Sequence, residues 1–361
     1  MDRTKALRVK YIDLAKALGM LTIVWAHIML TGVTFEAAYA FHIPLFFFLS
    51  GITFKRHKYT TLGSFLKSRF LSLMLPYAIF SVATWLLWVA YNLILQNPVD
   101  DFFYPLLQTV FAQGSDGFLE HNPPLWFVPC LMIVEILYFF ISKTKNWLNV
   151  TICVLCAIIG YLMLHIALPF DFTLLPWSIE SALSALIFYA AGNLLTTRFG
   201  IMWVPKIAQK KRLLTLGVIL ILTVLLFFVA PLNGHISLGS NSLGHSVLLF
   251  YLLAFCGTFS TLLFAALLED VSLPGLKLIP RFLCWVGRNS FYFMAFHMPI
   301  KSFIGIIVAR LLGVSTNTVY THYGFSAIVF VLCMIATSVA VLILSLIMNL
   351  IRKKPRKSSV T

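Results

Sequence analysis

The first apolar stretch of the sequence carries three side chains that could take part in chemistry. The segment YIDLAKALGMLTIVWAHIML, residues 11–30, contains Asp13, Lys16 and His27. Charged groups inside a membrane span cost about 2.5–3.5 kcal/mol each and normally face protein or water. Because an α-helix turns about 100° and rises about 1.5 Å per residue, His27 returns to the face of Lys16 about 16 Å further along the axis. The spacing predicts a polar stripe on which Lys16 can meet an anion and His27 can exchange a proton.

Each of these residues also has a simpler structural interpretation. Asp13 lies one helical turn from Lys16, so the two could form an interfacial ion pair, with the lysine chain reaching toward the membrane surface. His27 could be a membrane histidine that hydrogen-bonds a neighbouring helix. The shared face favours a functional interpretation, since unrelated residues need not align. A stripe of this length would suit a long anionic cofactor that enters from the cytoplasm.

A second polar cluster lies in WVGRNSFYFMAFHMPIK, residues 285–301. Asn289 or Ser290 is a candidate helix cap. His297 and Lys301 follow on one helical face, both deep in an apolar segment. Two such groups without a nearby acid indicate an anionic ligand or a wet cavity.

Two further polar residues interrupt apolar segments. His42 opens FHIPLFFFLSG and is expected at the outer start of the second span, either as an interfacial residue or near the site. Glu135 lies within PPLWFVPCLMIVEILYFF. Buried acids in membranes are usually paired, and Lys301, Lys16 or a histidine is the expected partner of Glu135.

The elements that must position these residues are membrane helices. Hydrophobic residues make up 60% of the 361, charged residues only 11%, and the mean hydropathy is +0.93. A spanning helix needs about 20 mostly apolar residues, and the second candidate is short, so we expect it to be broken, re-entrant or extended into the following loop. The sequence predicts an all-α, polytopic membrane protein that forms one domain over residues 1–361. Its ten predicted spans are 12–31, 41–54, 70–95, 124–142, 147–166, 181–197, 213–231, 245–268, 289–311 and 325–351.

The distribution of charge predicts the orientation of these spans. Ten spans place both termini on one side, and most of the 27 Lys and Arg residues then fall on that side, including a basic tail at 352–361. Opposite loops carry acids such as Glu36 and Asp101. This positive-inside pattern predicts cytoplasmic termini, so the net charge of +15 reflects topology and contact with membrane lipids. Nucleic acid is not an expected partner because the basic residues are spread over six loops.

Three other features complete the interpretation of the chain. The start of the sequence lacks the pattern of a cleavable signal peptide. The six cysteines fall within or at the ends of spans, so we expect no disulfide, and the Cys153–Cys156 CxxC is expected to serve packing rather than metal binding. The long outer loop 96–123 is a candidate lid or acceptor contact.

Five motifs in order resemble the acyltransferase-3 family of integral membrane acyltransferases, most closely its fucose 4-O-acetylase-like branch. The first is a basic residue followed after ten residues by histidine, here Lys16 and His27. The second is FHIPLFFFLSG, and the third is FLKSRFLSLMLPY, in which Arg69 is followed by Ser72 where many members carry a second arginine. The fourth is PPLWFVPCLM with Trp126, and the fifth is GRNSFYFMAFHMP with Ser290 and His297. The motifs span residues 11–301.

The resemblance implies transfer of an acyl group, usually acetyl, from acetyl-CoA to a hydroxyl of a sugar or glycoconjugate in a bacterial inner membrane. It implies His27 and His297 as catalytic residues, and Asp13, Lys16 and Arg69 at the donor site. His42, Trp126, Glu135, Ser290 and Lys301 would surround the acceptor or support the site. Acetyl-CoA would be a substrate, with neither a permanent cofactor nor a metal. His27 could deprotonate the acceptor for direct attack, or could carry the acyl group covalently.

Two other functions stay open at this stage. Buried His, Lys and Glu residues also form proton relays, so a transporter or flippase for a lipid or sugar is the main alternative. A membrane scaffold or sensor is a third, although it does not require Lys16 and His27 on one face. The sequence does not define the acceptor, the acyl chain or the oligomeric state.

Overall fold

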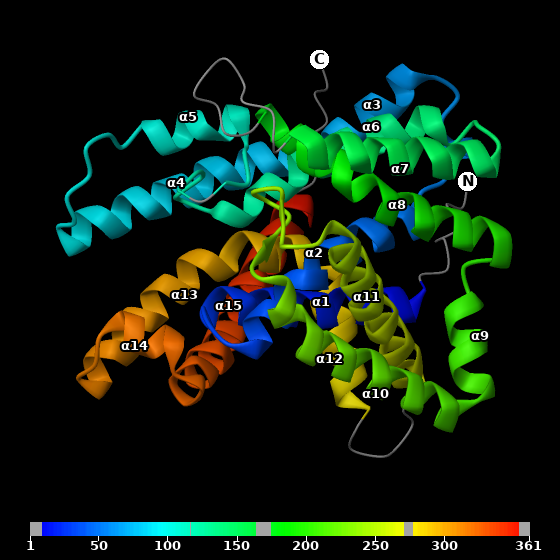
Figure 1. Cartoon of the computed structure of the whole chain (residues 1–361). Coiled ribbons are helices and arrows are strands. Elements are labelled where there is room, and N and C mark those ends of the chain that lie inside the picture. Colours follow the sequence, from blue (N-terminus) through cyan, green and yellow to red (C-terminus); the bar gives the residue numbers. More distant parts are fainter. Residues whose placement is uncertain (1–8, 116, 164–174, 271–276, 354–361) are drawn as a thin grey trace.

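A computed structural model describes residues 9–115, 117–163, 175–270 and 277–353 of the chain (Figure 1). In this part of the chain, nine helical segments are long and apolar enough to cross a membrane. The predicted all-α membrane fold is therefore confirmed. The nine are α1 (Lys10–Ile28), α2 (Val33–Thr53), the run of α3, η2 and α4 (Leu62–Leu95), η3 with α6 (Pro123–Ile141), η5 with α8 (Pro176–Phe199), α10 with η6 (Arg212–Asn233), α11 (Val247–Glu269), α13 (Ser290–Leu312) and α15 (Tyr323–Lys353).

Shorter elements complete the described chain. The fifth predicted span corresponds to α7 (Asn146–Leu162), which is apolar but has 17 residues. The other short elements are η1 (Arg56–Lys58), α5 (Tyr104–Phe111), α9 (Trp203–Lys210), α12 (Leu278–Arg288), α14 (Thr316–Thr321) and an antiparallel pair of strands, β1 (Ile236–Ser237) and β2 (Ser242–Leu243). The predicted basic tail lies outside the described residues from 354 onward.

The prediction for the second span was wrong. It expected a short or broken element over 41–54, whereas α2 is a continuous helix of 21 residues that begins at Val33. Gly32 has a φ of 89°, which glycine adopts without steric cost, and it turns the chain directly from α1 into α2. The segment 33–40 contains Glu36, a charged residue that is typical of a loop between spans. In the structure this segment forms the first two turns of the helix. His42 consequently lies in the middle of α2 rather than at its outer start.

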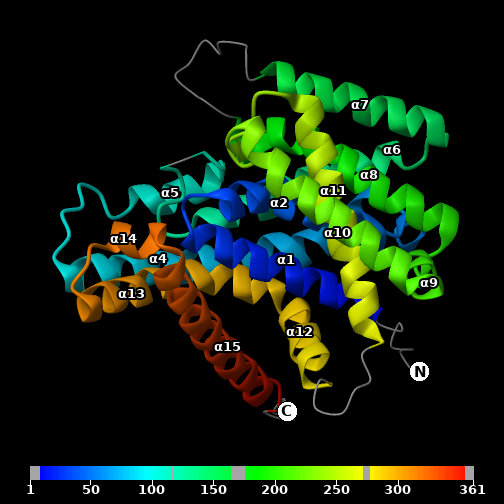
Figure 2. The same ribbon diagram turned by 60° about the horizontal axis from the view of Figure 1, so that its bottom comes forward.

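Helices α1 and α2 form the centre of the molecule. Helix α1 packs against α2, α11, α12, α13 and α15, while α2 packs against α8 and α11. Figure 2 shows both blue helices running through the middle, with the other helices on either side. Burial agrees with this placement, because most of α1 and α2 is buried, whereas α10 and α15 expose long apolar faces suited to lipid.

Glycine brings α2 and α8 into close contact. A Cβ atom at Gly51 would collide with the backbone carbonyl of Tyr189, and one at Gly192 would collide with that of Phe48. Small residues let helix backbones approach in membranes, where packing rather than the hydrophobic effect drives association. Gly51 ends the FHIPLFFFLSG segment, so this glycine fixes the position of the helix that carries His42.

Candidate active site

A cavity of about 360 Å³ follows one face of α1. Lys16, Met20, Ile23 and His27 line it. Their spacing of four, three and four residues is that of a single helical face, so the shared face predicted for Lys16 and His27 is present. The cavity joins a lysine near the predicted cytoplasmic end of α1 to a histidine near the opposite end.

His27 forms a hydrogen-bonded pair with His297 of α13. The Nδ1 atom of His27 lies 2.8 Å from Nε2 of His297, and the two rings are nearly parallel. The Nδ1 atom of His297 lies 2.9 Å from the carbonyl oxygen of Phe293. A carbonyl only accepts, so His297 donates from Nδ1, and its Nε2 in the neutral ring accepts from His27 Nδ1–H. Neutral His27 therefore carries its lone pair on Nε2, the nitrogen that a proton donor in the cavity can reach.

The two predicted catalytic histidines have different positions relative to the cavity. His27 lines it, whereas His297 is fully buried behind His27 and is not among the lining residues. His297 can fix the tautomer and orientation of His27, as the acid residue does for histidine in hydrolytic triads. The geometry thus assigns His297 a positioning role rather than contact with reacting atoms.

His42 lines the same cavity from α2. Its Nδ1 atom donates to the carbonyl of Ala38 at 2.6 Å, which leaves Nε2 for the cavity. Tyr39 lies between the two cavity histidines, with ring centroids 5.0 Å from His42 and 6.3 Å from His27. The position of His42 in mid-helix, and not an interfacial location, thus brings it to the site.

Residues outside the long helices also line the cavity. The loop after α5, part of the predicted lid or acceptor contact at 96–123, contributes Gly114, Ser115 and Phe118 to the lining. The predicted residues Trp126 and Ser290 also line the cavity. Sequence reasoning missed the hairpin of β1 and β2, which contributes three residues, Ser237, Leu238 and Gly239. Its Gly- and Ser-rich segment HISLGSNSLG is a recognisable turn signal between short strands.

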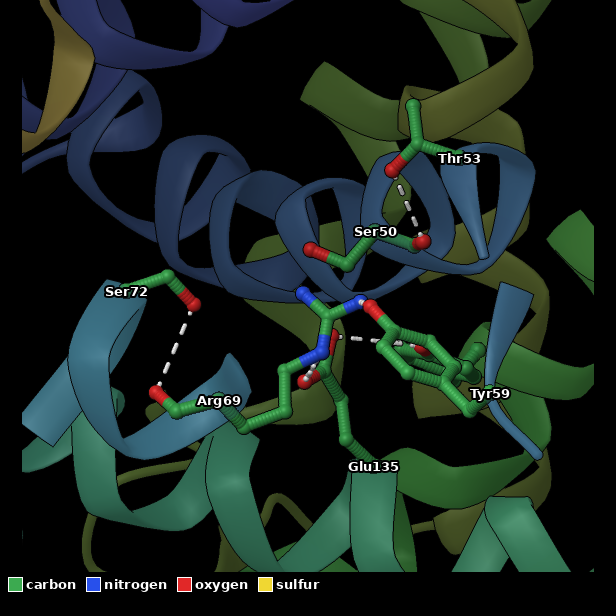
Figure 3. Close-up of polar contacts among 7 residues, drawn as sticks. Ser50, Thr53, Tyr59, Arg69, Ser72 and Glu135 are labelled. Carbon is green, nitrogen blue, oxygen red and sulfur yellow. Dashed lines mark hydrogen bonds and ion pairs between the residues drawn. The ribbon is translucent and has the colours of Figure 1, made fainter. Parts of the chain in front are cut away.

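Arg69 and Glu135 form a largely buried ion pair (Figure 3), and neither is among the residues that line the cavity. The Nε atom of Arg69 lies 3.1 Å from a carboxylate oxygen of Glu135, and another guanidinium nitrogen donates to the Tyr59 hydroxyl at 2.9 Å. Tyr189 donates to the second carboxylate oxygen at 3.3 Å. The expected partners of Glu135, namely Lys301, Lys16 or a histidine, were wrong. The partner is Arg69, because α3 continues through η2 into α4 and η2 packs against α6.

Two predicted residues lie away from the cavity lining. Asp13 is buried on α1, where α12 approaches so closely that a Cβ at Gly287 would collide with the Asp13 carbonyl. Lys301 places its ammonium 4.5 Å from the centroid of the Tyr320 ring, a cation–π geometry. Neither residue is brought into contact with the cavity by the structure.

Comparison with known proteins gives the chain a family. No curated protein and no solved structure matches it. The acyltransferase-3 family model, described as an acyltransferase domain, matches residues 9–348. Because the match covers nearly the whole chain and the fold is a bundle of membrane helices, the chain belongs to the acyltransferase-3 family and is a membrane acyltransferase.

Proposed function

We propose that the protein is an O-acetyltransferase that moves acetyl from cytoplasmic acetyl-CoA to a sugar hydroxyl of a cell-surface glycan or glycolipid, as in the fucose 4-O-acetylase-like branch. The observation that carries the proposal is the unprotonated Nε2 of neutral His27, a residue that lines the same cavity as Lys16. An alcohol is a weak nucleophile until a base of near-neutral pKa accepts its proton, and histidine suits this task.

The acetyl group is transferred as a C–O bond to the acceptor forms and the C–S bond of the thioester breaks. His27 Nε2 takes the proton of the acceptor hydroxyl as its oxygen attacks the thioester carbonyl. The new C–O bond forms, the C–S bond breaks, and the proton then passes from His27 to the departing thiolate of CoA. His297 stabilises the imidazolium that forms transiently, because its Nε2 accepts the hydrogen bond from His27 Nδ1–H.

The donor site lies toward the cytoplasmic end of the cavity. CoA is a polyanion, and lysine and arginine are the usual partners of phosphate. Lys16 lines this end together with Ser50. Arg69 is a further candidate, with its guanidinium oriented by Glu135 and Tyr59 (Figure 3). The pantetheine arm would extend along α1 toward His27, a length of about 16 Å.

The acceptor site lies toward the opposite end. Ser115, Ser237 and Trp126 provide hydroxyls and an aromatic surface near the cavity mouth, the usual mixture in sites for small polar ligands. The resemblance to bacterial members of the family supports the bacterial inner membrane as the location. His27 acts as the base in direct transfer, and a covalent acetyl-His27 is the alternative route.

The test is transfer of labelled acetyl from acetyl-CoA by the purified protein in lipid nanodiscs, with glycans or glycolipids of the producing cell as acceptors. We expect His27→Ala to abolish transfer while the protein remains folded. His322→Ala is the matched control, because His322 is exposed and is not among the lining residues. Full transfer by the His27→Ala variant would overturn the assignment. A wild-type protein that binds such lipids but never turns over acetyl-CoA would favour a transporter, since the cavity runs between both ends of α1.

The two chemical routes differ in a trapped species. Rapid quenching followed by mass spectrometry of the peptide with His27 would detect an acetyl increment if the acyl group passes through the imidazole. Direct transfer leaves that peptide unmodified at all times.

A further inference from the structure

A second cavity, of about 150 Å³, adjoins the first. Residues of α4, the loop before η3 and α13 line it, and Pro123 lines both cavities. On α13, Met294 lines the first cavity and Met298 the second, so one helical turn that includes His297 separates them. A cavity of about this size accommodates a single six-membered ring.

The floor of this cavity holds an unusual histidine. His121 is 4% exposed, and neither of its ring nitrogens has a hydrogen-bond partner among the described residues. Buried polar groups are normally paired, and each unpaired group requires an explanation. Burial lowers the pKa of His121 to about 4, so at neutral pH the ring offers one N–H donor and one acceptor.

The loop that carries His121 is fixed in place. The side chain of Asn122 donates to the carbonyl of Ala295 on α13 at 2.8 Å. The buried amide oxygen of Gln108 accepts from the backbone N–H of Leu119 at 2.9 Å. Leu119 has a φ of 54°, a conformation that leucine rarely adopts. Strained backbone persists where surrounding contacts enforce it and is concentrated at functional sites.

The walls of the cavity are aromatic and carry one acid. Trp88 and Tyr91 come from α4 and Phe303 from α13, and the rings of Tyr91 and Phe303 meet edge to face at 5.0 Å. Glu120 is exposed at the edge, and it is the charged side chain among the residues that line the cavity. A sugar ring has apolar C–H faces and a rim of hydroxyls that both donate and accept. Aromatic walls cover the faces, and His121 can bind a hydroxyl in both ways at once.

We propose that the second cavity is a subsite for a neutral or amino sugar ring of the acceptor, next to the sugar that is acetylated. This inference rests on the proposed function, under which the bound sugar belongs to the acceptor and its neighbour is acetylated. Binding of the ring itself does not require acetyl transfer. Glu120 disfavours acidic sugars by like-charge repulsion and favours an amino group. A lipid chain could fill the apolar walls but would leave both nitrogens of His121 unpaired, at the desolvation cost of each.

The experiment measures thermal unfolding of the purified full-length protein without acetyl-CoA. The probes are galactose, fucose, N-acetylglucosamine, glucosamine and glucuronic acid, each at high millimolar concentration. A ligand that binds only the folded state raises Tm, and we expect at least one neutral or amino sugar to raise it by about 2–3 °C beyond the general effect of sugars on protein stability. His121→Phe keeps the ring shape and removes both polar atoms, so this specific rise should vanish. His121→Gln restores a donor and an acceptor and should recover part of it.

Two control variants and a kinetic measurement define the outcome. His322→Ala should retain the rise, as should His27→Ala, because the subsite is distinct from the base. An equal rise in wild type and His121→Phe, no specific rise with any probe, or a rise with glucuronic acid alone would overturn the proposal. In the transfer assay, His121→Phe should raise KM for glycan acceptors about tenfold, as expected for the loss of one or two hydrogen bonds, and leave KM for acetyl-CoA unchanged. A wild-type protein without acetyl transfer would refute the proposed function and leave the sugar-binding result intact.

Discussion

His27 and His297 make one functional unit in which the two rings have separate tasks. The hydrogen bonds from His297 to Phe293 and from His27 to His297 run in one direction. This arrangement leaves an unprotonated nitrogen, Nε2, on His27, the histidine of the pair that lines the cavity. A buried neutral histidine is well suited to this position because, unlike a carboxylate, it brings no charge into the membrane interior.

Substitution of His297 should reduce turnover rather than binding. His297→Ala removes the acceptor that fixes His27, so we expect kcat to fall about 100-fold with KM for donor and acceptor nearly unchanged. His297→Gln places an amide near the position of Nε2 and should recover part of the rate. Steady-state kinetics of both variants test this. A large rise in KM with constant kcat would indicate instead that His297 contacts a substrate.

The Arg69–Glu135 pair predicts a separation between stability and donor binding. Glu135→Ala leaves a largely buried guanidinium without its counter-charge, which should reduce the free energy of unfolding by about 3 kcal/mol. The double variant Arg69→Met/Glu135→Leu removes both charges and should regain most of the thermal stability. If Arg69 also contacts CoA phosphate, the double variant will fold well but show a raised KM for acetyl-CoA. An unchanged KM would assign the pair a purely structural role.

Sequence could identify these residues but not all their partners. Lys16 and His27 share one helix, so the helical period alone predicts their common face. Glu135 pairs with a residue 66 positions earlier, and His27 with one 270 positions later. Such contacts depend on which helices pack together. An apolar helix can bury its surface against many different helices or against lipid, so the sequence alone does not specify its neighbours.

Among the helices, the contact between α2 and α8 fixes the position of α2, which forms one wall of the cavity. Helix α2 contributes Tyr39, His42, Phe46 and Ser50 to that wall. Gly51 and Gly192 allow the two backbones to approach where any side chain would collide. Displacement of α2 would therefore change the distance between His42 and His27.

Gly51→Ala should destabilise the protein and reduce its activity. The added methyl meets the backbone of α8 rather than a flexible side chain, so α2 must shift, at a cost of about 1–3 kcal/mol. Gly217→Ala is the matched control, since a Cβ at that position of α10 meets nothing within 4 Å, and alanine is the better helix former by about 1 kcal/mol. Thermal unfolding and transfer rates of the two variants test this. Equal behaviour of both would show that the α2–α8 contact is not limiting.

The elements that sequence predicted well were those with long apolar runs. The first two turns of α2 were missed because Glu36 and Thr34 interrupt the apolar pattern that marks a span. The β1–β2 hairpin was missed because two-residue strands carry almost no periodic signal. Both segments contribute residues to the cavity lining, and in both the polar residues interrupt the apolar pattern from which elements are predicted.

The whole molecule is asymmetric across the membrane. Loop charge predicts that basic residues such as Lys55 and Lys58 flank the cytoplasmic ends of the spans, with Glu36, Asp100 and Glu120 on the opposite side. The cavity follows one face of α1, with Lys16 at one end of that face and His27 at the other. This orientation is a prediction from sequence alone, because loop charge follows topology. The cavity itself could not be predicted in this way, since it depends on the packing of the surrounding helices and loops.

The asymmetry predicts that acetyl-CoA is used from one side only. In sealed proteoliposomes, acetyl-CoA cannot cross the bilayer because it is highly charged. The orientation of the protein can be read from exposed positions on either side, with Lys58→Cys for the cytoplasmic face, Asp100→Cys for the opposite face and a membrane-impermeant maleimide as label. Five of the six native cysteines are buried and should react little. We expect transfer only from molecules whose Lys58 side faces the compartment with acetyl-CoA, with the acceptor in the other compartment. Equal transfer with the donor on the Asp100 side would refute a cytoplasmic donor site at Lys16.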